Sequence, residues 1–149
     1  MSAPIASLFS SGAGGLPPAE PLDFATLRLP ASPNACLAAP AGAHPQAQVV
    51  TPPLPVDAGT AWPVLRALGD GMDRVARYGE FPARRQAQWV ARSALMNYPD
   101  IIVAELVPGA QGAGLFLYSR SLFGWSDMGV NRKRVEAWLA ALDAALRRR

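Results

Sequence analysis

The chain has 149 residues, half of them apolar and 17% charged, which is the size and composition of one globular domain. Its single cysteine excludes an intrachain disulfide, and one cysteine with one histidine cannot supply the four ligands of a structural zinc site. The acidic residues form no cluster that suggests a magnesium or calcium site, so we expect no cofactor.

Charge and proline are distributed unevenly along the chain. Residues 1–58 hold 11 of the 15 prolines and only four charged groups, which are Glu20, Asp23, Arg28 and Asp57. They carry a net charge of −2, whereas residues 59–149, with 13 Lys/Arg and eight Asp/Glu, carry +5. No stretch approaches the roughly 18–20 apolar residues of a transmembrane helix. The first basic residue is Arg28, so a signal peptide is not expected, and the default location is cytoplasmic.

The proline-rich part divides in two. Residues 1–21 are so rich in Pro, Gly and Ser that we expect a flexible arm. Residues 22–58 intersperse apolar side chains with prolines that forbid a long helix, which predicts an extended segment wrapped across a core. A wholly disordered leader is the alternative. Together with residues 59–149, this segment is expected to form a single domain over 22–149.

Regular elements are predicted from Gly59 onward. A helix begins near Thr60, capped by Thr60 or Asp57, and ends at Gly69 to Gly71. Four runs bounded by turn residues then predict strands at 74–78, 87–93, 100–107 and 114–121. Their short connections favour hairpins, so an antiparallel meander is expected.

The last helix has the clearest pattern. One apolar stripe is formed at helical spacing by Val135, Trp138, Leu139, Leu142 and Leu146. Two helices on one face of a four-stranded antiparallel meander give a two-layer α+β domain, with the Pro-rich N-terminal segment extended across it. Trp62, Trp89 and Trp138 are read as core, whereas Trp125 is a candidate wall of a pocket.

Polar residues gather between the last strand and the last helix. Asn131 precedes Val135 by four residues, and Arg134 precedes Trp138 by four, so both side chains should face the sheet. A buried polar group needs partners. Those available are Ser119, Arg120, Ser121, Asp127 and, across the sheet, Asp100. Asp127 or Ser126 should also cap the helix.

The run from Ser119 to Arg134, SRSLFGWSDMGVNRKR, resembles the signature of the domain of unknown function 1499 family. Ser32-Pro33-Asn34 and Tyr98-Pro99-Asp100 are similar to two further motifs of that family, and the likeness extends from about Asp23 to the final helix. The resemblance implies a fold and a motif set without a reaction. Many members place Cys beside the motif Asn, whereas here Ala35 separates Asn34 from Cys36. Many also begin with an export, lipid or membrane segment, which is not expected here.

Two hypotheses follow for this polar corner. It either fixes the helix on the sheet as a structural lock, or it binds a small anionic ligand through arginine, serine hydroxyls and a helix N-terminus. The candidate residues, shared by both hypotheses, are Asn34, Asp100, Ser119, Arg120, Ser121, Asp127, Asn131 and Arg134.

Other function classes have weaker support. The only histidine, His44, lies in a loop-like PAGAHP run, so Ser–His and Cys–His mechanisms are not expected. A small hydrolase using Asp100 or Asp127 as its acid or base is one alternative. Weak nucleic-acid binding by Arg84, Arg85 and the basic runs at 132–134 and 147–149 is another, but no known binding motif accompanies them. We expect a non-catalytic module whose partners the sequence does not identify.

Overall fold

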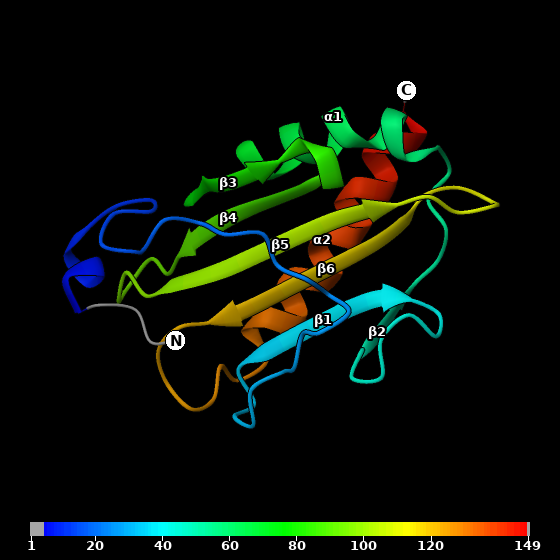
Figure 1. The fold of residues 1–149 in the computed structure, drawn as a ribbon. Helices are drawn as coiled ribbons and strands as arrows, with labels where there is room; N and C mark the ends of the chain where they lie inside the picture. The colour runs from blue at the N-terminus through cyan, green and yellow to red at the C-terminus, as the bar shows by residue number, and fades with distance from the viewer. Residues whose placement is uncertain (1–4, 149) are drawn as a thin grey trace.

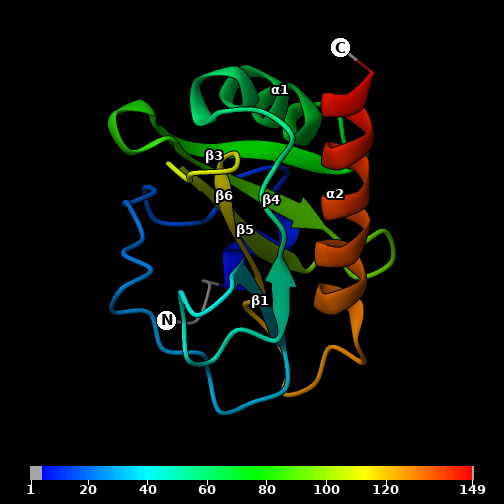
Figure 2. The ribbon, with the colours of Figure 1, turned by 90° about the vertical axis from the view of Figure 1, so that its right-hand side faces the viewer.

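The computed structural model describes residues 5–148 and has an α+β fold. Six strands form one sheet: β1 (Ala35–Pro40), β2 (Val49–Thr51), β3 (Val75–Phe81), β4 (Gln86–Arg92), β5 (Pro99–Val107) and β6 (Gly114–Ser121). Two helices, α1 (Ala58–Asp70) and α2 (Val130–Arg147), lie together on one face of it (Figures 1 and 2). Two short 3-10 helices, η1 (Ile5–Phe9) and η2 (Pro82–Arg84), complete the elements.

The sheet is larger than the sequence predicts. Its order is β2-β1-β6-β5-β4-β3, so β3 to β6 form the expected antiparallel meander, but β1 and β2 extend it beyond β6. The two added strands are parallel to one another, which makes the sheet six-stranded and mixed rather than four-stranded and antiparallel. The expectation missed them because β1 is buried on both faces and therefore lacks alternation.

The helices cover one face because their apolar stripes point at the sheet. Asp57 caps α1 by accepting the backbone N–H of Thr60 at 2.7 Å. Trp89 of β4 and Trp138 of α2 meet edge to face beneath the helices, with ring centroids 5.2 Å apart. Gly69 lies against the Trp89 ring, where an added Cβ would come within 2.2 Å of it. A glycine is therefore required for α1 to approach the sheet this closely.

The opposite face of the sheet carries a second, smaller apolar cluster. Phe24 stacks on Phe116 of β6 with centroids 4.8 Å apart, and Leu37, Val103 and Tyr118 are buried beside them. Figure 2 shows the N-terminal segment, in blue, on this side of the sheet and the helices on the other. Residues 22–29 thus pack as a layer on this face.

Side chains of β4 bind backbone groups of this N-terminal layer. Gln86 accepts from the N–H of Leu22 at 2.8 Å and donates to its carbonyl at 2.7 Å, as a neighbouring strand would. Gln88 donates to the Glu20 carbonyl at 2.8 Å. Arg92 donates to carbonyl oxygens of residues 7, 12 and 14. The segment before β1 is therefore fastened by hydrogen bonds as well as by apolar packing.

Candidate functional site

Asn131 lies at the centre of the polar residues that join α2 to the sheet. It occupies the first turn of α2 and is fully buried, with 0% of its surface exposed. Its side-chain Nδ2 lies 3.1 Å from the Asn34 carbonyl, 2.8 Å from Ser121 Oγ and 2.8 Å from Asp127 Oδ2. One amide group therefore contacts the residue just before β1, the end of β6 and the loop before α2.

The amide oxygen of Asn131 also has partners within the chain. It accepts from Ser119 Oγ at 2.5 Å and from Arg134 Nη1 at 2.9 Å. The same Arg134 nitrogen donates to Ser119 Oγ at 3.1 Å and to Asp100 Oδ2 at 2.8 Å. We call the set joined by these bonds the Asn131 corner: Asn34, Asp100, Ser119, Ser121, Asp127, Asn131 and Arg134.

The two acids of the Asn131 corner have opposite pKa shifts. Burial raises the pKa of Asp100, and the neighbouring Arg134 guanidinium lowers it only in part. Burial also opposes ionisation of Asp127, but hydrogen bonds from the Asn131 side chain and from the N–H groups of Gly129 and Asn131 outweigh it. The pKa of Asp127 is therefore below its ordinary value, and its carboxylate is stabilised at the start of α2.

Asp127 caps α2 from outside the helix. Its Oδ1 accepts the Gly129 N–H at 2.8 Å and its Oδ2 accepts the Asn131 N–H at 3.1 Å. Gly129, the residue at the N-cap position, has a left-handed backbone with φ 84° and no side chain to serve as a cap. Ser126, the other expected cap, instead accepts the Met128 N–H at 3.2 Å within the loop.

Asn34 ties the turn before β1 to the loop after β6. Its side-chain Nδ2 donates to the Gly124 carbonyl at 2.9 Å, and its Oδ1 accepts from Ser32 Oγ at 3.0 Å. Its own carbonyl accepts the Ser121 N–H at 2.9 Å in addition to the Asn131 amide. Asn34 thus joins segments that are 90 or more residues apart in the chain.

Arg120 is the one candidate residue that lies elsewhere. Side chains alternate along β6, so Ser119 and Ser121 face α2 while Arg120 points to the opposite face of the sheet. This corrects the expectation that Arg120 shares the corner. The alternation of a strand was the signal that could have separated it from its neighbours.

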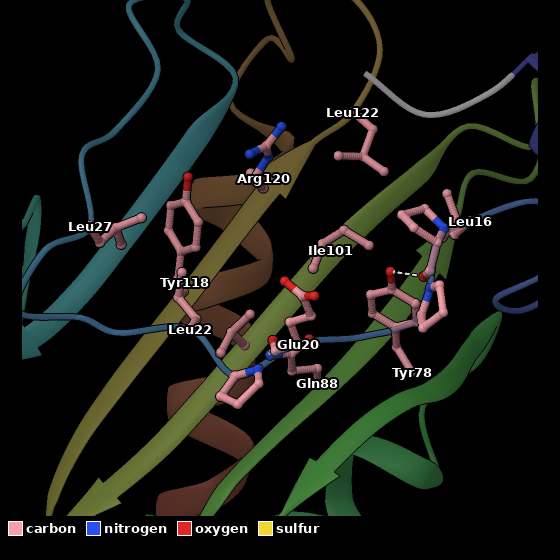
Figure 3. Close-up of a pocket in the computed structure, with 14 residues that line it drawn as sticks. Leu16, Glu20, Leu22, Leu27, Tyr78, Gln88, Ile101, Tyr118, Arg120 and Leu122 are labelled. Atoms are coloured by element: carbon pink, nitrogen blue, oxygen red, sulfur yellow. Dashed lines mark hydrogen bonds between the residues drawn. The ribbon is translucent and has the colours of Figure 1, made fainter. Parts of the chain in front are cut away.

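On that opposite face Arg120 lines a pocket of about 430 Å³, which we call the Arg120 pocket (Figure 3). One wall is the N-terminal segment from Leu16 to Leu22, and the floor includes Ile101 and Val103 of β5. The lining is mainly apolar, and its polar side chains are Glu20, Tyr78, Gln88, Tyr118 and Arg120. Sequence reasoning missed all of these except Arg120, because they come from segments far apart in the chain.

The polar groups of the Arg120 pocket differ in charge and partners. Burial raises the pKa of Tyr118, and the positive charge of Arg120 offsets part of that rise. Burial and the nearby Glu20 carboxylate both raise the pKa of Tyr78, whose hydroxyl donates to the Pro17 carbonyl. The pocket therefore holds one cation, one exposed carboxylate and two neutral phenols around an apolar floor.

The remaining candidates lie in separate places. Cys36 is buried, and burial raises the pKa of its thiol, which fits a packed side chain better than a nucleophile. His44 contacts the Leu27 carbonyl at 2.9 Å and accepts the Gln46 N–H at 3.0 Å in a loop. Trp125 is exposed and does not line the Arg120 pocket.

Two broader features concern metals and membranes. Within residues 5–148, no three His, Cys, Asp or Glu side chains are grouped as a metal ion would require. None of the helices in that range has the length and apolar character needed to cross a bilayer.

Residues 27–142 match the protein family described as Protein of unknown function (DUF1499). The chain belongs to this family. The matched range runs from the layer on the far face of the sheet into α2, so it includes the whole Asn131 corner together with Arg120. A search of curated proteins found no match. The family description names no reaction.

Proposed function

We propose that this member of the family is a non-catalytic ligand-binding module. Its motif residues serve two roles, one structural and one in ligand binding, on opposite faces of the sheet. The Asn131 corner is a structural lock that fixes α2, and the Arg120 pocket binds a small anion that carries an apolar body. The observation that supports this division is the position of Arg120, which faces away from the seven other candidate residues.

The structural role of the Asn131 corner is supported by its hydrogen bonds, which pair its polar side chains with one another. Asn131 is fully buried, and the two side-chain atoms of its amide face five partners within the chain. Arg134 faces Asp100 with both side chains largely buried. A ligand would have to displace these hydrogen bonds, and breaking a buried charged pair is strongly unfavourable. The geometry therefore favours a structural role for this cluster.

Ligand binding is supported by the composition of the other face. A cavity of about 430 Å³ falls within the roughly 300–1,000 Å³ of small-molecule sites, which combine apolar walls with a few orienting polar groups. Arg120 supplies the cation, and its planar guanidinium suits carboxylate and phosphate groups. The apolar part of the ligand would lie over Ile101 and Val103, against the wall formed by Leu22.

A thermal-melt titration with sodium decanoate tests the pocket, with 1-decanol as its uncharged counterpart. At ten times the dissociation constant, binding stabilises the fold by about 1.4 kcal/mol. For a domain of this size, that raises the melting temperature by about 3–6 °C. We expect Arg120→Gln to remove most of the shift and decanol to produce little.

The matched control is Arg132→Gln, which removes an exposed arginine of the same motif that does not line the Arg120 pocket. It should leave the decanoate shift unchanged. Equal shifts in wild type and Arg120→Gln would refute the proposed pocket. A shift lost in Arg132→Gln instead would indicate nonspecific attraction of the anion by surface charge.

The hydrolase alternative has no comparable support. Asp100 lies against Arg134, and both oxygens of Asp127 accept hydrogen bonds at the start of α2. Neither carboxylate lines the Arg120 pocket. Nucleic-acid binding is also disfavoured, because basic residues of three separate runs have acidic neighbours: Arg84 with Glu105, Arg132 with Glu136, and Arg147 with Asp143.

A further inference from the structure

Exposed apolar side chains gather at one end of the molecule. Eight large hydrophobic residues are exposed within the described part of the chain. All except Val50 lie in three segments: η1, the β4–β5 loop, and the β6–α2 loop with the first turn of α2. Figure 1 shows these three segments at the same end of the sheet. We call this set the loop-end patch: Phe9, Leu95, Met96, Tyr98, Trp125, Met128 and Val130.

Hydrogen bonds and ring contacts place the three segments side by side. Asn97 donates to the carbonyls of Leu8 and Ser10 at 2.9 and 2.7 Å, which brings Phe9 beside the β4–β5 loop. Tyr98 of that loop stacks on Phe123 of the β6–α2 loop with centroids 5.7 Å apart. The segments that carry the exposed residues are therefore neighbours at this end of the sheet.

The side chains of the loop-end patch are too exposed to be the partly buried edge of a hydrophobic core. Phe9 is 88% exposed, Leu95 and Met128 are each 90% exposed, and Trp125 is 68% exposed. Single exposed hydrophobic residues are ordinary, but seven of them on adjoining segments indicate an interaction surface. Because the side chains project from loop tips, they suit insertion into a soft interface better than contact with a rigid protein partner.

The charges around the patch identify the kind of interface. Arg74 donates to the carbonyls of Arg92 and Ser93 at the base of the β4–β5 loop, and Lys133 is exposed in the first turn of α2. Within residues 5–148, no ion pair includes Arg74 or Lys133, and both residues are exposed. Two exposed cations, Arg74 and Lys133, thus lie on or next to the segments that carry the apolar tips.

We propose that the loop-end patch docks the protein onto the surface of an acidic lipid bilayer. Tryptophan, leucine and methionine at the loop tips would enter the headgroup region, while the exposed Arg74 and Lys133 face the anionic lipid. Attraction by these cations should weaken as salt screens it, whereas the apolar contribution should persist. This goes beyond the proposed ligand binding and uses none of the side chains that carry it.

The test is co-sedimentation with vesicles of phosphatidylcholine, with and without 30% phosphatidylglycerol. We expect about tenfold tighter binding to the acidic vesicles, and a further loss of at least tenfold in the triple variant Leu95→Ser, Trp125→Ser and Met128→Ser. The matched control is Val50→Ser, which removes the exposed apolar residue of the distant edge strand β2 and should change affinity less than twofold.

A second measurement on the wild type does not depend on any variant folding. Acidic vesicles containing brominated phosphatidylcholine should quench the exposed Trp125, since Trp89 and Trp138 are buried in the core and Trp62 is half-buried on α1, so the quenching should be lost in Trp125→Phe. No binding to acidic vesicles, equal binding to neutral ones, or equal losses in the triple variant and Val50→Ser would overturn the proposal. So would self-association without lipid that the triple variant abolishes, because the occupant would then be a second copy of the chain.

Discussion

Replacing Asn131 by alanine should destabilise the fold more than any change on the outer face of α2. The substitution removes a buried amide with five polar neighbours, among them Asp127 and Arg134. Each polar group left buried without a partner costs about 1–3 kcal/mol. Because some of the neighbours can re-pair with one another, we expect a net loss of about 3–4 kcal/mol. That is a large part of the roughly 5–15 kcal/mol by which domains are stable.

Urea unfolding measures this loss directly. With a slope of roughly 1–3 kcal/mol/M, the midpoint should fall by about 1–3 M. The control is Arg132→Ala, one residue along α2, where the exposed side chain lies 3.8 Å from Glu136 and its loss should change stability by no more than about 0.5 kcal/mol. A loss below about 1 kcal/mol in Asn131→Ala, or an equal loss in both variants, would refute the structural lock.

Three further predictions concern stability, pH and ligand affinity. Gly69→Ala should lower the free energy of unfolding by about 2–3 kcal/mol in thermal or urea unfolding, because the added Cβ would overlap the buried Trp89 ring. Gly59→Ala, also on α1, should be neutral or stabilising, because its Cβ would make only ordinary contacts, the nearest at 3.4 Å to Asp57. Equal effects of the two would contradict the close approach of α1. The pKa of Asp127 is lowered in the folded state, so its contribution to stability is present above the ordinary value near pH 4 and is lost as pH falls. The gap in unfolding free energy between wild type and Asp127→Asn should therefore shrink below about pH 4, and a gap independent of pH would count against this carboxylate cap. Glu20→Gln removes the carboxylate that lines the ligand pocket and should tighten decanoate binding by about 2–5-fold in calorimetry, a gain of roughly 0.4–1 kcal/mol expected of one exposed charge; weaker binding would contradict an anionic ligand.

Patterns within single elements could be predicted from the sequence. The stripe of α2 follows from spacing alone, and it correctly placed Val135, Trp138, Leu142 and Leu146 in the core. The same spacing placed Asn131 against the sheet, where it is fully buried. Turn residues marked the meander, although β3 runs to Phe81 and contains an irregularity between Arg77 and Gly79 that no local pattern indicated.

Features that depend on contacts between distant segments could not be predicted. Strand β1 has the sequence ACLAAP, which is short, alanine-rich and buried on both faces, so neither alternation nor β-propensity distinguished it. The Arg120 pocket has a wall from residues 16–22 and a floor from β5, and nothing local links the two. Arg120 lies on the face opposite Ser119 and Ser121 although it stands between them in sequence, because side chains alternate along a strand.

The separation of lock and ligand site can be tested in one titration. Amide chemical shifts of the ¹⁵N-labelled chain, followed as decanoate is added, should change for Ile101, Tyr118, Arg120 and the segment from 16 to 22. The N–H of Asn131 and that of Arg134 should move little. Shifts concentrated at Asn131 and Arg134, with the pocket residues unchanged, would mean that the anion binds at the corner and that the two faces have been assigned the wrong roles.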